Sequence, residues 1–164
     1  MVDKVFLTGV LFLFLFGCSG YEFTYSKDPK IKEIEKKTDY IILGDDITLA
    51  KINIIEELGI SSNEAKFLLN ISIDRINTPI VIEKDATVSK TEIKHSVVYS
   101  MLQKSDGCKI LSKNISTRSN YSSSSSGYSF STDLSEEEVV KNNLKNNIDE
   151  FIDYLISFDG PISC

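Results

Sequence analysis

The sequence has little material for metal or thiol chemistry and no excess of positive charge. Its 164 residues include one histidine and three cysteines, and the formal net charge is −6. So few imidazole and thiol groups argue against a metal centre. The acidic balance argues against a broad basic surface that binds nucleic acid. Motifs of the G-x-S-x-G, P-loop, Rossmann and H-E-x-x-H types are also absent from the sequence. We therefore expect a protein that is not an enzyme and that holds no metal and no cofactor.

The longest apolar run lies close to the first residue. Residues 5–16 read VFLTGVLFLFLF. A helix of that length is about 18 Å long, whereas the hydrocarbon core of a bilayer is about 30 Å thick. The run is too short for a comfortable membrane span and suits the apolar part of a signal peptide. We predict that residues 1–17 are a lipoprotein signal peptide.

The end of this run resembles a bacterial lipobox. It reads Leu15, Phe16, Gly17 and Cys18, so that a small residue precedes a cysteine able to receive a diacylglycerol. Phe16 is less usual at its position. Cys18 is the predicted lipidation site, and several acyl chains make a durable anchor. An ordinary signal peptide, or a marginal transmembrane helix with an incidental cysteine, is the alternative. The residue after the lipidated cysteine influences sorting, and aspartate there would favour retention in the inner membrane. Ser19 stands at this position and predicts the outer membrane.

The rest of the chain divides into a tether, one domain and a tail. Residues 18–38 are polar and predict a lipid-anchored N-terminal tether. Residues 39–158 predict a single α+β domain, and residues 159–164 a C-terminal tail. The domain begins with a strand that ends at residues 39–43. A helix follows and stops at Gly59.

Alternating apolar and polar residues predict three strands after this helix. The first begins near residue 69, and Pro79 should break or end it unless it continues over residues 80–82. The third runs from about Lys109 to Tyr121. The inward face of the second strand comprises Thr91, Ile93, His95, Val97, Tyr99 and Met101.

The last element is an amphipathic helix. Ser135 and Glu138 form a capping box at its predicted start, and the serine run at residues 122–126 predicts a flexible polar loop before it. The alternative for this loop is a segment that becomes ordered on a partner. The apolar stripe of the helix comprises Val140, Leu144, Ile148, Phe151, Ile152 and Leu155. The expected fold is α+β, with two helices packed on one face of a four-stranded, mostly antiparallel sheet in the order β-α-β-β-β-α.

Few polar residues qualify as catalytic or ligand-binding groups. His95 is expected to be a satisfied core residue, because it lies on the inward face of its strand. Asp45 and Asp46 fit a turn and a helix cap better than a catalytic carboxylate pair. Acidic residues 136–138 fit the first turn of a helix, where the helix dipole favours acids, better than a cation site.

The two cysteines beyond the lipobox and the distribution of charge each allow two interpretations. Cys108 and Cys164 are expected to be unpaired thiols, with a disulfide in the oxidising periplasm as the alternative. Basic residues exceed acidic ones over residues 84–118, and acidic residues exceed basic ones over residues 133–159. A basic sheet beside an acidic helix could hold an anionic ligand such as a lipid head group, or could simply be a solvated surface.

Taken together, these features resemble the family of LPS-assembly lipoproteins (LptE) in a divergent, alphaproteobacterial-like form. The resemblance extends over nearly the whole mature chain. It depends on Cys18, Gly20 and Tyr21 at the lipobox, and on a helix that ends at residues 57–59 before KFLLNISI. It also depends on the segment KILSKNISTRSNY after a turn at residues 106–107.

The resemblance implies a non-enzymatic role. Members of this family plug a large outer-membrane β-barrel, the LPS-assembly protein LptD, and take part in lipopolysaccharide transport to the cell surface. The implied partners are an LptD-like barrel, lipopolysaccharide and the outer membrane of a Gram-negative bacterium, reached through the lipidated Cys18. Lys84, Lys90 and Lys94 are the implied lipopolysaccharide-binding residues. The family's second basic region has Asp133 and neighbouring glutamates here. The alternative function is an auxiliary lipoprotein of an ABC-type or phospholipid transport system.

Overall fold

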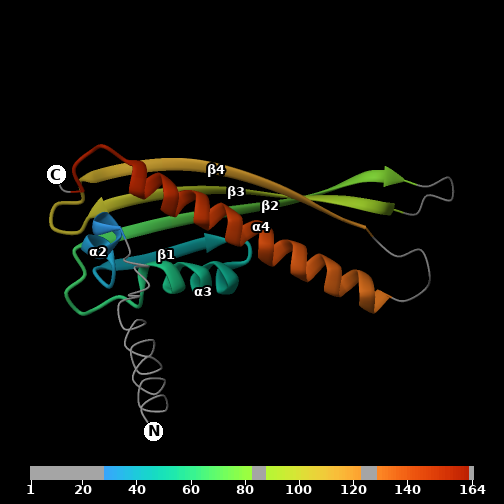
Figure 1. Cartoon of the computed structure of the whole chain (residues 1–164), viewed down its shortest axis with the longest axis horizontal. Coiled ribbons are helices and arrows are strands. Elements are labelled where there is room, and N and C mark those ends of the chain that lie inside the picture. The colour runs from blue at the N-terminus through green and yellow to red at the C-terminus, as the bar shows by residue number, and fades with distance from the viewer. Residues whose placement is uncertain (1–27, 83–87, 123–128, 163–164) are drawn as a thin grey trace, which may run out of the picture.

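The computed structural model describes residues 28–82, 88–122 and 129–162 as a sheet with helices on one of its faces (Figure 1). The sheet has four strands in the order β1-β2-β3-β4. β1 pairs with β2 in parallel, and the other two pairs are antiparallel. This confirms the α+β fold predicted from the sequence. The elements are α2 (Pro29–Ile34), β1 (Thr38–Gly44), α3 (Ile47–Leu58), β2 (Phe67–Ile82), β3 (Val88–Gln103), β4 (Lys109–Ser122) and α4 (Ser129–Ser157).

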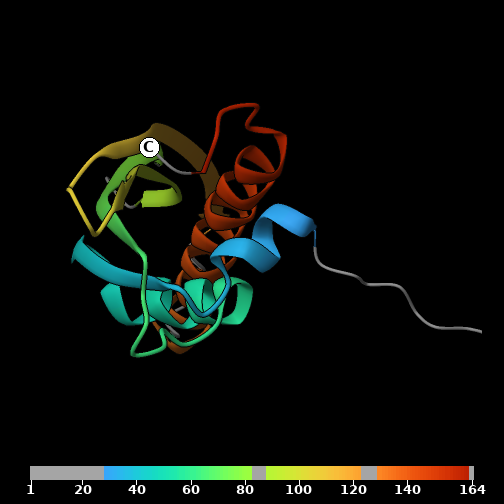
Figure 2. The same ribbon diagram turned by 90° about the vertical axis from the view of Figure 1, so that its left-hand side faces the viewer.

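The core lies between the sheet and the helices α3 and α4, which Figure 2 shows on the same side of the sheet. The predicted stripe of α4 and the predicted inward face of β3 are both buried, so these two predictions are confirmed. The ring of Phe151 stacks on the ring of Tyr99, with centroids 4.0 Å apart and planes 5° from parallel. This stacked pair joins α4 to β3, and such pairs contribute to stability beyond the apolar area that they bury.

The helix α2 belongs to the packed domain, although its residues were predicted to be part of the tether. Asp28 accepts a hydrogen bond from the backbone N–H of Lys30 and caps the helix. Ile31 and Ile34 are buried in the core. Nζ of Lys30 donates to the carbonyl of Ile156 at the end of α4, at 2.8 Å. Two apolar residues within a Lys/Glu run were too weak a signal to predict a helix from the sequence. Contact with α4 stabilises this helix.

The strand β2 continues through Pro79. Oδ2 of Asp45 accepts from the backbone N–H of Arg75 on the β1 side of β2. Alternate residues of a strand point their N–H groups the same way, so the nitrogen of Pro79 also faces that side, beyond the end of β1 at Gly44. Pro79 therefore removes no bond to β3, and the register shifts only after it. The prediction that Pro79 breaks or ends the strand is wrong.

The helix α4 begins earlier than the sequence predicts, and strand β4 has a lysine on its inward face. The helix begins at Ser129, so Ser135 and Glu138 lie within it and do not form a capping box at its start. Lys113 lies on the inward face of β4, opposite Tyr99 of β3. Its Nζ lies 4.5 Å from the centroid of the Tyr154 ring, a cation–π contact that accommodates a lysine on the inward face. The serine run from residue 123 lies outside the described residues.

The hairpin between β3 and β4 contains a disulfide-bonded cysteine. Cys108 is disulfide-bonded, and its partner lies outside the described residues. The expectation of two unpaired thiols is therefore wrong for Cys108, because sequence spacing does not reveal which cysteines meet in space. Gly107, which precedes it, has a φ of +71° in the predicted turn.

Candidate functional site

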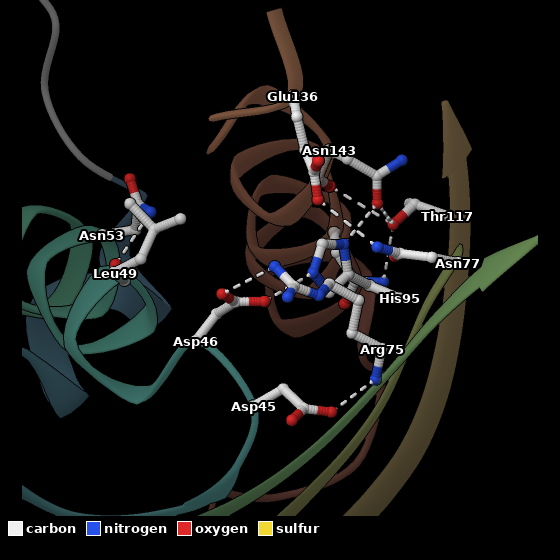
Figure 3. Close-up of polar contacts among 11 residues, drawn as sticks. Asp45, Asp46, Leu49, Asn53, Arg75, Asn77, His95, Thr117, Glu136 and Asn143 are labelled. Carbon is white, nitrogen blue, oxygen red and sulfur yellow. Dashed lines mark hydrogen bonds and ion pairs between the residues drawn. The ribbon is translucent and has the colours of Figure 1, made fainter. Parts of the chain in front are cut away.

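A cluster of polar side chains lies where β1 ends and α3 begins (Figure 3). Asp46 precedes α3 with a φ of 51°, and its side chain does not cap the helix. Its carboxylate instead faces the sheet. Oδ1 accepts from a guanidinium N–H of Arg75 at 3.1 Å, and Oδ2 lies 3.1 Å from Nε2 of His95. The sequence placed Asp46 correctly before the helix but assigned the wrong role to its carboxylate.

His95 is fully buried and bonded through both ring nitrogens. The amide of Asn143 satisfies all its neighbours when Nδ2 donates to Nδ1 of His95 at 2.7 Å and to the hydroxyl of Thr117 at 2.9 Å. Its Oδ1 then accepts from the backbone N–H of Ser119 at 2.9 Å. This orientation assigns the ring proton to Nε2, which donates it to Asp46.

This arrangement fastens elements of the fold together. A general base needs a free nitrogen within reach of a substrate proton, whereas both nitrogens of His95 have side-chain partners. Asp46 comes from the start of α3, Arg75 from β2, His95 from β3 and Asn143 from α4. The cluster thus ties both large helices to the sheet at one point.

The burial of two asparagines of α4 was not predicted from the sequence. Asn143 and Asn147 are at most 1% exposed. Oδ1 of Asn147 accepts from the hydroxyl of Tyr99 at 2.9 Å, and its Nδ2 donates to the carbonyl of Ile115 at 3.2 Å. Burial, with a smaller contribution from the charges of Glu150 and Asp149, raises the pKa of Tyr99. Their burial could have been predicted from their position, three and seven residues after Val140. That spacing places them on the same side of the helix as the apolar stripe.

The acidic residues 136–138 lie well inside α4 and not in its first turn. Oε2 of Glu136 accepts from the hydroxyl of Tyr121 at 2.9 Å. Burial and then this hydrogen bond raise the pKa of Tyr121. Glu137 and Glu138 are exposed. Among the described residues, no group of His, Cys, Asp or Glu is arranged to hold a metal ion.

A groove of about 520 Å³ opens between α3 and α4 beside the cluster. Its apolar part is formed by Leu49, Ile52 and Val140. Its rim carries both signs of charge, with Arg75 and Lys141 opposed by Asp46, Glu136 and Glu137. The groove therefore presents no single charge that would select an anionic head group.

Two of the lysines implied as ligand-binding residues, Lys90 and Lys94, lie on the other face of the sheet. Lys90 and Lys94 alternate with the buried residues of β3, so they point away from the helices. Lys94 is directly opposite Arg118 of β4. Lys84 and the lipobox residue Cys18 lie outside the described residues. The structure thus groups Lys90, Lys94 and Arg118, and separates them from the acidic residues of α4.

The fold is shared with several solved structures of bacterial proteins. A Caulobacter crescentus CB15 protein described as a lipoprotein is similar, with a TM-score of 0.63 and 12% identity over 77% of this chain and 93% of that chain. Uncharacterized lipoprotein B from Nitrosomonas europaea has a TM-score of 0.56 and 13% identity, over 74% and 83%. A minor lipoprotein from Acinetobacter baumannii has a TM-score of 0.55 and 10% identity, over 78% and 96%.

At these identities the similarity establishes the fold and not the activity. No protein-family model and no curated protein matches the sequence. Within residues 28–82, 88–122 and 129–162, no helix is long and apolar enough to cross a membrane.

Proposed function

We propose that the protein is a lipid-anchored outer-membrane lipoprotein that plugs an LptD-like β-barrel and takes part in lipopolysaccharide transport. The observation that supports this most is the combination of the lipobox at Cys18 with a fold similar to bacterial lipoproteins over nearly their whole length. The role is non-enzymatic, in keeping with the fully bonded His95. The domain offers a sheet with one face uncovered, which suits a protein that completes its burial inside a partner.

Affinity purification of the tagged full chain from solubilised outer membranes is expected to recover a large β-barrel protein. Depletion of the chain should lower both the correctly assembled barrel and the lipopolysaccharide at the cell surface. The Cys18→Ser variant is the control for the anchor, because loss of the acyl chains should move the protein from the membrane pellet to the soluble fraction. Recovery of inner-membrane transport subunits without a barrel would support the alternative transport system instead.

The double variant Lys90→Glu with Lys94→Glu is expected to weaken binding of purified lipopolysaccharide about thirtyfold, since each basic group near an anionic surface contributes about 1 kcal/mol. Both side chains lie on one face of β3, and Lys94 is directly opposite Arg118. The matched control is Lys51→Glu with Lys141→Glu, which changes the charge equally at exposed positions on α3 and α4. Binding would be measured by fluorescence titration at moderate salt. Equal weakening by both pairs would assign the effect to net charge alone.

A further inference from the structure

Three segments of the chain lie at one end of the domain. They are α2, the hairpin between β3 and β4, and the residues that follow α4, which are at the left in Figure 1 and face the viewer in Figure 2. We call residues 158–162 the C-terminal segment. Nζ of Lys30 in α2 donates to the carbonyl of Ile156 at 2.8 Å and also to the carbonyl of Phe158. The helix α2 is therefore fastened to the last turn of α4 and to the start of the C-terminal segment.

The hairpin holds the backbone of Cys108 in a closely bonded turn. The N–H of Gln103 donates to the carbonyl of Cys108 at 2.8 Å, and the N–H of Gly107 donates to the carbonyl of Gln103 at 2.9 Å. The N–H of Cys108 donates to Oδ1 of Asp106 at 3.1 Å. Cys108 is disulfide-bonded, so this fixed turn is one side of a covalent link to another part of the chain.

The sequence offers two partners for this bond, Cys18 and Cys164, and both lie outside the described residues. In the proposed function the sulfur of Cys18 carries a diacylglycerol, and a sulfur bonded to this lipid has no thiol left for a disulfide. The elimination leaves Cys164. This step rests on the lipid anchor of the proposed function.

The C-terminal segment supplies a second reason that does not depend on the anchor. Phe158 and Ile162 are partly buried against the core. The ring of Phe158 lies so close to Gly160 that a Cβ atom there would be 2.4 Å from Cζ of the ring. The segment is therefore folded back on the domain, and Figures 1 and 2 show it turning from the end of α4 toward the β3–β4 hairpin.

The length of chain that follows Ile162 favours the same partner. Cys164 is two residues further on, and two residues span at most about 7 Å. A disulfide joins Cα atoms that are about 4 to 7 Å apart. Because the connection is short and starts from a packed residue, little conformational freedom is lost when the bond closes.

We infer that Cys108 and Cys164 form a disulfide that fastens the C-terminal segment to the β3–β4 hairpin. The ring that it closes contains β4 and α4. The two thiols lose two protons and two electrons as the S–S bond forms. A dithiol–disulfide oxidase accepts both through a mixed disulfide, and its own disulfide is reduced to two thiols. Oxidants of this class keep the periplasm oxidising.

The bond and Lys30 hold the C-terminal segment from two sides. Reduction of the disulfide removes one of them, so we expect amide hydrogen exchange to become about tenfold faster in residues 29–34 and 158–162. The polar cluster around His95 lies at the other end of β1 and α3. Exchange in residues 93–99 should not change. Hydrogen exchange followed by mass spectrometry measures both regions.

Peptide mapping of the full chain identifies the partner directly. The chain is purified from membranes in detergent with N-ethylmaleimide present and is digested with trypsin without a reductant. Cleavage after lysine places Cys18, Cys108 and Cys164 in residues 18–27, 105–109 and 146–164. The expected product joins 105–109 to 146–164 and disappears on reduction, while 18–27 carries acyl chains. Non-reducing electrophoresis should show the mass of one chain.

Each other product overturns the inference in a distinct way. Maleimide on Cys108, together with acylated 18–27, would refute the disulfide and leave the lipid anchor standing. A product that joins 105–109 to 18–27 would refute both the pairing and the anchor. A band with the mass of two chains would show that the bond joins separate copies. Failure to recover a β-barrel on affinity purification would refute the proposed function alone.

Thermal unfolding tests whether the bond fastens the fold. A phosphine reductant is expected to lower the Tm of the natural chain by about 10 °C, because a disulfide that closes a long ring restricts the unfolded chain. Cys164→Ser should have this lower Tm already and should not respond to the reductant. Ser163→Ala is the matched control and should behave like the natural chain. A natural chain with the same Tm before and after reduction, or a Cys164→Ser variant that still responds, would contradict the inference.

Discussion

Gly44→Ala is expected to lower the free energy of unfolding by about 4 kcal/mol, a large part of the stability of a typical domain. Gly44 ends β1 with a φ of +102°, a conformation that side chains disfavour. A Cβ atom at this position would lie 1.9 Å from the carbonyl oxygen of Ile73 in β2. Because that oxygen belongs to the backbone, the two strands would have to separate. Urea denaturation followed by circular dichroism measures the loss.

Gly107→Ala provides the matched control. Gly107 also has a positive φ, +71°, but no atom lies within 4 Å of the place where its Cβ would be. Only the conformational strain remains there, so a loss of about 1 kcal/mol is expected. Equal losses for the two variants would show that the close approach of β1 to β2 is not the cause.

Asp46→Ala is expected to lower the free energy of unfolding by about 3 kcal/mol, because it leaves the buried N–H of His95 without its acceptor and Arg75 without its ion pair. The two bonds are each 3.1 Å long. Asp46 has a φ of 51°, and the strain of alanine in that conformation adds to the loss. The same denaturation experiment measures the change.

Two further variants separate these causes. Asp46→Asn keeps a residue that tolerates the left-handed conformation and retains one acceptor, so about half the loss is expected. Asp45→Ala removes the exposed neighbour, which bonds only the backbone N–H of Arg75 among the hydrogen bonds described above, and should cost under about 1 kcal/mol. If Asp45→Ala proved as harmful as Asp46→Ala, the cluster around His95 would not be the source of the effect.

The main elements of the fold could be predicted because their signals are periodic and local. The alternation along β3 and the stripe from Val140 to Leu155 each repeat over several turns or residues, and burial follows the predicted faces. The boundaries that were wrong depended on contacts made at a distance. Ile31 and Ile34 form a helix against α4, and Pro79 is tolerated because its nitrogen faces the open edge of β2.

The polar cluster could not be predicted from local patterns. Asp46 and His95 are separated by 49 residues, and His95 and Asn143 by 48. The residues around Asp46 are equally compatible with a helix cap. The sequence therefore predicted that role for its carboxylate. The grouping of Lys94 with Arg118 likewise could not be predicted, since it requires the register of β3 with β4.

The open edge of β2 beyond Gly44 bears on the tendency of the chain to aggregate. A sheet edge with free N–H groups is a template on which strands of other molecules can pair and aggregate. Here the N–H of Arg75 is already bonded to Asp45, Pro79 has none, and the shift in register that follows would interrupt any ladder. The edge nearest the exposed apolar residues Ile80 and Ile82 thus resists pairing with strands of other copies of the chain.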